Sequence, residues 1–282
     1  MKIVCSILSA IVAVVITGSA AISHPHITDK GYEAYITGDF ATAIQEWRRL
    51  AERGQARSQN NLGMMYDEGM GVLQDYDEAA SWYGLAAEQG YAEAQFNLGR
   101  MYSKGKGVPQ SYVEAIRWWT LAADWGHVPA RYRLGMMYEL GNGTPQNFVE
   151  AAEWHKLAAE QGYAKSQNNL GVMYFIGEGV SQDYVEAIKW YKLAAEQGSK
   201  AAQYNMGWMS EFGKGVPQDN IMSHMWYSVS AANGNSEADE RRIELESKMS
   251  FSSIAKSQGM SLKCLDTDYD DCGGYDRIYL WH

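Results

Sequence analysis

The chain of 282 residues has few prolines, few cysteines and too few basic residues to balance its acidic ones. It contains five prolines, which suits a helical chain because proline interrupts helices. It has 24 Lys and Arg against 34 Asp and Glu, a net charge of −10. That balance argues against a nucleic acid as partner, since neutralising phosphates requires a basic face. The 46% hydrophobic content, with 10 Trp and 19 Tyr, is enough to bury a substantial apolar surface.

One apolar run stands at the start of the chain. Lys2 precedes an apolar stretch at 3–16, and small residues follow up to Ala21. This order is typical of a secretion signal, and the stretch is short for a membrane-spanning helix, which needs about 20 residues. We predict a signal peptide at 1–21, cleaved near Ala20 or Ala21, with no stable membrane span afterwards. The mature protein would then be exported, periplasmic or extracellular, most naturally in a bacterium. The alternative is an uncleaved N-terminal anchor.

Two of the three cysteines would remain after Cys5 leaves with the signal. An even count in an exported protein suggests a disulfide, here between Cys264 and Cys272 in a tail at 258–282. The acidic residues between them begin with the spacing of a calcium loop. Asp271, however, stands where that loop needs glycine, and Arg277 where it needs glutamate. We therefore expect an acidic loop closed by a disulfide and no metal.

A segment of 13 residues recurs five times at a constant interval of 36 residues. The copies read LGMMYDEGMGVLQ, LGRMYSKGKGVPQ, LGMMYELGNGTPQ, LGVMYFIGEGVSQ and MGWMSEFGKGVPQ, and they start at Leu62, Leu98, Leu134, Leu170 and Met206. A fixed period of this length predicts stacked repeats. Apolar residues at helical spacing on both sides of the Gly-x-Gly pair predict two helices per unit.

The recurring glycines have two different predicted roles. The Gly-x-Gly pair could cradle a phosphate, but its middle residue varies from Met70 to Glu178, and no Lys-Ser or Lys-Thr follows. We interpret it as a turn between helices. A second glycine column lies inside each first helix, where glycine costs about 1 kcal/mol relative to alanine. We expect close approach of the paired helix to offset this cost at Gly63, Gly99, Gly135, Gly171 and Gly207.

The full repeat pattern, A-x-x-x-L-G-x-M-Y-x-x-G-x-G-V-x-Q-D-Y-x-E-A-x-x-W-Y-x-L-A-A-E-Q-G, resembles the Sel-one-like repeat, a relative of the tetratricopeptide repeat. The resemblance implies an all-α, right-handed α/α superhelical solenoid of 36-residue helix-turn-helix units. Before the units we expect a divergent N-terminal half repeat at 28–55, and after them a capping helix at 236–257. The units themselves are expected at 56–91, 92–127, 128–163, 164–199 and 200–235.

The resemblance also implies a concave groove lined by the first helix of each unit, as in family members that act as adaptors for other proteins. One column of this helix is almost entirely asparagine, whose amide can pair with the backbone of a bound peptide. The alternative is that these amides brace neighbouring helices. The column comprises Asn61, Asn97, Arg133, Asn169 and Asn205.

Other groove columns change character along the chain. Units one and two carry polar residues such as Asp67, Glu68, Arg100 and Lys104. Apolar residues at the same columns of later units are not required by the stack, and exposed apolar surface marks interaction sites. The alternative is a locally wider core or contact with the C-terminal helix. The apolar candidates are Tyr132, Met136, Leu140, Val172, Phe175, Ile176, Trp208 and Phe212.

Catalysis has little support in the sequence. None of the six histidines has a nucleophile or zinc ligands at a suitable spacing, His155 occupies an aromatic packing column, and His224 stands alone. Some cysteine-rich family members are associated with weak β-lactamase activity, but these repeats contain no cysteine. We therefore predict an exported, non-catalytic adaptor without cofactor that binds a protein or peptide. The alternative is a protein that binds an envelope polymer, peptidoglycan or exopolysaccharide, and a weak hydrolase ranks third.

Overall fold

The computed structural model describes residues 29–270 and 272, which form fourteen helices and no strand. The predicted all-α class is confirmed. The predicted signal segment at 1–21 lies outside the described residues, as does the chain beyond Cys272. Among the helices described, none is long and apolar enough to cross a membrane. The helices are α1 Lys30–Ile36, α2 Phe40–Ala51, α3 Ala56–Glu68, α4 Tyr76–Glu88, α5 Ala92–Lys104, α6 Tyr112–Asp124, α7 Val128–Leu140, α8 Phe148–Ala159, α9 Ala164–Ile176, α10 Tyr184–Ala195, α11 Lys200–Phe212, α12 Asn220–Ala232, α13 Ser236–Glu246 and α14 Phe251–Asp266.

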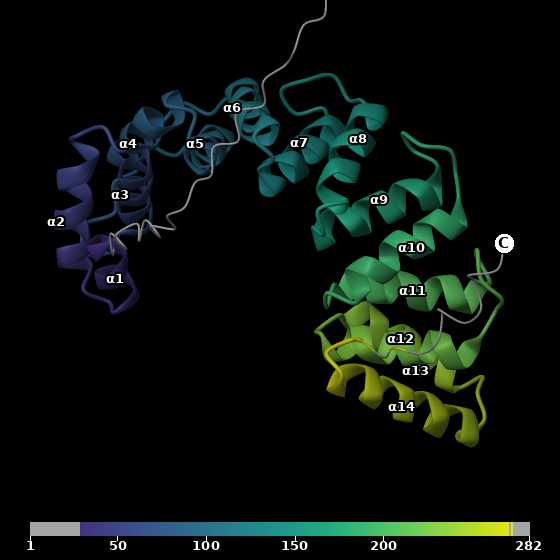
Figure 1. Ribbon diagram of the computed structural model, residues 1–282. Coiled ribbons are helices and arrows are strands. Elements are labelled where there is room, and N and C mark those ends of the chain that lie inside the picture. The colour runs from purple at the N-terminus through teal and green to yellow at the C-terminus, as the bar shows by residue number, and fades with distance from the viewer. Residues whose placement is uncertain (1–28, 271, 273–282) are drawn as a thin grey trace, which may run out of the picture.

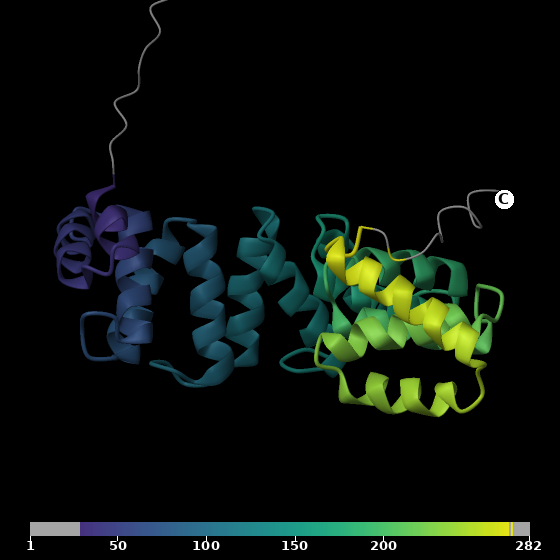
Figure 2. The same cartoon turned by 90° about the horizontal axis from the view of Figure 1, so that it is seen from below.

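The helices form an open arc (Figure 1). Each 36-residue unit contributes one pair, from α3 and α4 to α11 and α12, and each helix of these units packs against the next along the chain. In Figure 1, α3, α5 and α9 lie nearer the inside of the arc than α4, α6 and α8. The view from below shows the pairs following one another in a row (Figure 2). The predicted solenoid of 36-residue repeats is thus the observed architecture.

The turn inside each unit follows from local chemistry. Gly105 ends α5 in the left-handed region at φ 66°, which glycine adopts without a steric penalty. Ser111 then caps α6, because its hydroxyl accepts the N–H of Glu114. Gly107 lies against the preceding unit, where an added Cβ would stand 1.9 Å from the carbonyl oxygen of Tyr76. The Gly-x-Gly pair is therefore an inter-helix turn that also packs one unit on another.

The glycines inside the first helices make the predicted close contact. A Cβ at Gly99 would lie 2.6 Å from the ring of Trp119 and 3.1 Å from the carbonyl oxygen of Ala115. The Trp119 ring is buried and donates its indole N–H to Phe96 O at 3.1 Å. The expected close approach of the paired helix is thus observed at this glycine. Gly63, Gly135, Gly171 and Gly207 meet the aromatic ring at the same column of their own units.

The N-terminal segment is more complete than the predicted half repeat at 28–55. It forms the short helix α1 as well as α2. Gly31 in α1 packs on Trp47 in α2, so that a Cβ there would lie 2.4 Å from Trp47 Nε1. This is the same glycine-on-aromatic contact that holds the later pairs together. The prediction missed α1 because the turn between α1 and α2 lacks the Gly-x-Gly signature.

The single capping helix predicted at 236–257 is wrong, because this region forms α13 and α14 with a break between them. Ser250 begins α14, its hydroxyl accepting the N–H of Ser253, and α14 runs on into the predicted tail as far as Asp266. It packs on α12, where Met225 and Val229 are fully buried. The residues at the same columns one unit earlier, Lys189 and Leu193, are exposed.

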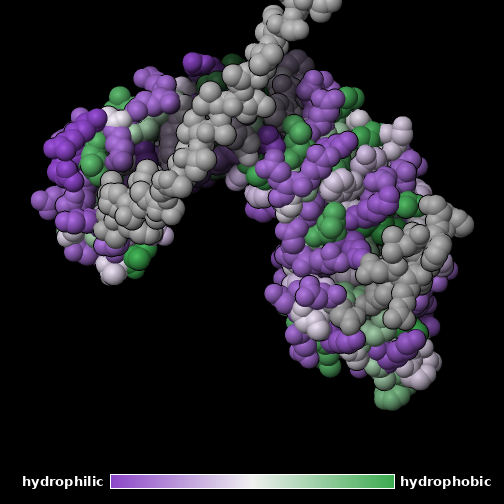
Figure 3. All heavy atoms as spheres, viewed as in Figure 1, coloured by the Kyte–Doolittle hydropathy of each residue, from purple (hydrophilic) through white to green (hydrophobic). Residues whose placement is uncertain are grey.

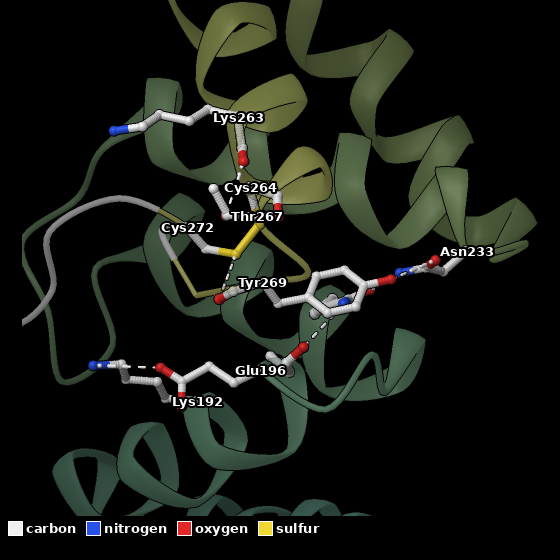
Figure 4. The surroundings of a disulfide bond; sticks show 10 residues. Lys192, Glu196, Asn233, Lys263, Cys264, Thr267, Tyr269 and Cys272 are labelled. Carbon is white, nitrogen blue, oxygen red and sulfur yellow. Dashed lines mark hydrogen bonds and ion pairs between the residues drawn. A yellow bond between two sulfur atoms is a disulfide. The ribbon is translucent and has the colours of Figure 1, made fainter.

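A disulfide between Cys264 and Cys272 closes the end of α14, with Cα atoms 4.3 Å apart (Figure 4). Both cysteines are buried and belong to the same apolar cluster as Met225 and Val229. Between them, Tyr269 donates its hydroxyl to Asn233 Oδ1 at 2.9 Å. Its ring also lies next to Gly198, at the turn after α10. The loop thus ties α14 to the last two units.

Candidate functional site

The predicted groove residues lie on the sides of the first helices that the paired helices leave uncovered. On α11 these positions are Asn205 and Trp208, both half-buried, and Phe212, which is exposed. The equivalent positions of α3, α5, α7 and α9 have similar exposure, apart from the exposed Arg133. This regularity follows from the helical repeat, which places residues three and four apart on one face. The five helices therefore present one continuous surface with matched columns.

Side chains of the asparagine column form hydrogen bonds within the protein itself. Asn97 donates its amide to Asn60 Oδ1 at 3.1 Å, and Asn205 donates to Asn168 Oδ1 at 3.2 Å, each in the preceding unit. Asn169 instead lies 3.5 Å from His155 Nε2. The proposed bracing role therefore has direct geometric support. Recognition of a peptide backbone by Asn61, Asn97, Arg133, Asn169 and Asn205 remains a prediction.

Three of the apolar candidates form an exposed column at the C-terminal ends of their helices. Leu140, Ile176 and Phe212 are 56%, 46% and 45% exposed. The same column carries Glu68 in unit one and Lys104 in unit two. Polar residues thus satisfy the fold at this position, and roughly half of each apolar side chain stays exposed in the described chain. We name Leu140, Ile176 and Phe212 the apolar column.

Two further candidates, Phe175 and Trp208, are half-buried behind this column. Their rings meet edge to face with centroids 5.1 Å apart, and Trp208 also lies 4.6 Å from the Phe212 ring. Both pack against the core cluster of α10 to α12, so the alternative of a locally wider core holds in part for them. They still border a pocket of about 180 Å³, whose other lining residues are Tyr191, Tyr204, Asn205 and Met209.

Tyr132 contributes mainly to packing within and between units. Its ring lies 5.7 Å from His155 and 5.3 Å from Tyr163, and burial raises the pKa of its hydroxyl. The guanidinium of the exposed Arg133 stands 5.9 Å from the same ring. The third unit thus offers Leu140 to solvent while Tyr132 remains half-buried.

A charged contact joins α11 to α13 next to Phe212. Glu211 is buried, and its Oε2 accepts a hydrogen bond from Tyr227 and one from Arg241, each 2.8 Å long. Burial, followed by the bond to Glu211, raises the pKa of Tyr227. The Arg241 guanidinium also lies 5.6 Å from the ring of Phe212. Helix α13 therefore borders the apolar column at its last residue.

Sequence reasoning missed the partners of His224. Its Nε2 lies 2.9 Å from Glu246 Oε1 in α13, and its Nδ1 lies 2.6 Å from Ser257 Oγ in α14. The hydrogen bond with His224 lowers the pKa of the Glu246 carboxyl. Although the three residue types are those of an acyl-transfer site, His224 and Ser257 are fully buried, which leaves no room for a substrate. The trio joins α12, α13 and α14.

No other grouping in the described residues suggests a chemical site. Within 29–270 and 272, no three His, Cys, Asp or Glu side chains are placed to hold a metal ion. On the face drawn in Figure 3, hydrophobic and hydrophilic residues are interspersed and no broad apolar area stands out. The apolar column and the pocket behind it are therefore the best candidate for a binding site.

Comparison with known families matches all five units. The model described as Sel1 repeat matches residues 56–91, 92–127, 128–163, 164–199 and 200–235. No curated protein matches the chain.

Two solved structures resemble the chain closely. One is c5321, a protective antigen present in uropathogenic Escherichia coli strains and displaying an SLR fold. It is 32% identical over 88% of this chain, with a TM-score of 0.75. The chain spans 56% of that protein. The other is a Sel1 repeat protein from Oxalobacter formigenes, 36% identical over 73% of this chain and 84% of its own length, with a TM-score of 0.70.

Proposed function

Because the chain belongs to the Sel1 repeat family, whose members generally serve as protein-interaction scaffolds, we propose that it is an exported, non-catalytic scaffold. It binds a protein or peptide on the concave side of units three to five. The observation that carries this proposal is the apolar column, exposed where units one and two have Glu68 and Lys104.

The chemistry of this surface suits a protein ligand. Contiguous exposed apolar side chains mark interaction sites, and binding energy concentrates on large aromatic residues at the centre of such a patch. Phe212 and Trp208 provide the large aromatic residues, at the α11 end of the apolar column, and Trp208 lines the pocket of about 180 Å³. The aromatic rings would also suit a sugar, which keeps an envelope polymer as the alternative ligand.

Replacing the apolar column by lysine should abolish partner binding without unfolding the protein. Lysine stands at this column in unit two as Lys104, so Leu140→Lys, Ile176→Lys and Phe212→Lys together should keep the melting temperature within a few degrees. Loss of a single side chain that contributes about 2 kcal/mol to the binding free energy already weakens binding roughly thirtyfold. The partner is first identified by cross-linking in envelope extracts, and its Kd is then measured for both proteins.

The matched control is Lys104→Leu, which lies at the same column outside the proposed site and should leave the Kd unchanged. Wild-type affinity in the triple-lysine variant would remove the apolar column as the site. Retention of a glycan by the wild-type protein, in place of a protein, would favour the envelope-polymer function.

Export rests on the residues at 1–21 and on the disulfide, which forms in oxidising compartments. Non-reducing peptide mapping of protein from its native host should find a first residue between Ala20 and His24. The same map should link Cys264 to Cys272, a bond worth about 2.5 kcal/mol in the chain-entropy model. A chain that starts at Met1 and carries two free thiols at these positions would contradict export.

A further inference from the structure

Paired amide side chains link successive units at the edge where the second helices end. In unit one, Gln59 donates to the carbonyl oxygen of Ala51 in the preceding helix pair, at 3.1 Å. Gln89, just after α4, then donates to Gln59 Oε1 at 2.6 Å. We call this arrangement the amide clamp. It recurs in unit four between Gln197 and Gln167, and in unit five between Asn233 and Gln203.

Unit two lacks half of this clamp. Gln95 still donates to the carbonyl oxygen of Ala87 at 3.2 Å, but the second amide is replaced by Trp125. Gln95 is only 3% exposed, and its Oε1 has no hydrogen-bond partner among the described residues. Trp125 itself is 75% exposed. The tryptophan therefore leaves a buried acceptor unsatisfied and gains little burial in return, the kind of local inconsistency that marks functional sites.

The surroundings of Trp125 are acidic. Glu88 and Asp124 are exposed at the C-terminal ends of α4 and α6, and neither forms an ion pair within residues 29–270. The equivalent Glu160 and Glu196 are each paired with a lysine one turn earlier. Because the C-terminal end of a helix is already negative, an unpaired carboxylate there adds to an unfavourable potential that a cation would relieve.

The neighbouring basic groups have partners of their own, and Arg131 is held at this same end of α6. The Nε of Arg131, which stands at the first clamp position of unit three, donates to the carbonyl oxygen of Ala123 at 3.2 Å. The Nε2 of His127 lies 3.0 Å from Glu93, a contact that lowers the pKa of that carboxyl. Trp125 thus presents an exposed indole face next to Asp124, whose carboxylate forms no ion pair among the described residues. A guanidinium can stack on such a ring and donate hydrogen bonds to such a carboxylate.

We propose that Trp125, with Asp124 and Glu88, forms a second interaction surface that receives an arginine side chain from a basic segment of a partner protein. The guanidinium stacks on the indole and donates hydrogen bonds to Asp124. This surface lies where the second helices end, and it is separate from the apolar column at the C-terminal ends of the first helices. A test of this second surface can therefore succeed or fail independently of the test of the proposed groove.

The decisive variant is Trp125→Gln, which restores the residue found in units one, three and four. It should raise the melting temperature by about 2–4 °C, because the new amide satisfies Gln95 Oε1. It should also weaken binding of an acetylated, amidated hexa-arginine peptide at least tenfold, measured by isothermal titration calorimetry at low salt. Stabilisation together with lost binding is not expected of a tryptophan that serves only the fold.

Two further variants separate stacking from general attraction by an acidic protein. Trp125→Tyr keeps an aromatic face and should retain most of the peptide affinity. Asp124→Asn should weaken binding, whereas Glu153→Gln removes the same charge from an exposed site on α8 and should leave it unchanged. Equal affinity of wild-type and Trp125→Gln proteins, absence of binding to the wild type, or an equal effect of the two charge variants would each overturn the proposal.

Discussion

Replacing Gly107 with alanine should destabilise the stack by about 3–5 kcal/mol. Gly107 has φ +65°, a conformation that costs an alanine roughly 1–2 kcal/mol by itself. The added Cβ would also stand 1.9 Å from Tyr76 O and 2.3 Å from the carbonyl carbon of Tyr76. These are backbone atoms of α4, and they can move away only if unit two separates from unit one. Urea unfolding followed by circular dichroism measures the loss.

Gly90→Ala is the matched control for this prediction. Gly90 also has a positive φ, of +83°, but no atom lies within 4 Å of the position of an added Cβ. Gly90→Ala should therefore lower the free energy of unfolding only by the conformational cost of the positive φ, about 1–2 kcal/mol. If both variants unfold at the same urea concentration, contact between the units at Gly107 is not what requires glycine there, and the packing role of the turn is wrong.

Met225→Arg should release α14 from the body of the protein. Met225 is fully buried in the cluster that α14 completes, while Arg117 occupies the same column of unit two in solvent. A guanidinium at position 225 has no carboxylate in that cluster to pair with, so docking of α14 would bury an uncompensated charge. We expect a loss of about 3–5 kcal/mol. Amide protons of α14 should exchange much faster, and the disulfide should become accessible to reductant.

The control is Lys189→Arg, at the same column in unit four. This residue is exposed, so the change should stay within about 0.5 kcal/mol and leave exchange in α14 as in the wild type. Continued protection of α14 in Met225→Arg would show that the helix does not depend on this face of α12. Release of α14 with the groove intact should leave partner binding at the apolar column unaffected.

Part of the candidate site could be predicted by comparing equivalent positions of the repeats. Leu140, Ile176 and Phe212 stood out because Glu68 and Lys104 occupy their column, and the structure leaves all three exposed. The comparison could not tell that Phe175 and Trp208 pack against each other and against the core. Their half-burial depends on how closely adjacent helices approach each other. Comparing the residues at one equivalent position gives no information about that approach. Trp125 also differs from the amide residues at the equivalent positions of the other units. Only the structure shows the consequence, which is that Gln95 Oε1 lacks a hydrogen-bond partner among the described residues.

The sequence by itself determined the paired helices of the five repeat units, the turns between them and the stacking period. These features depend on short-range chemistry: apolar spacing along a helix, the positive φ that Gly105 and Gly107 tolerate, and the capping hydroxyl of Ser111. The tertiary structure alone decided that the chain turns back at Ser250, that α14 covers Met225 and Val229, and that His224 meets Glu246 and Ser257. Those contacts join segments that are far apart in the chain. They form only where two folded surfaces are complementary in shape and charge, which no local pattern records.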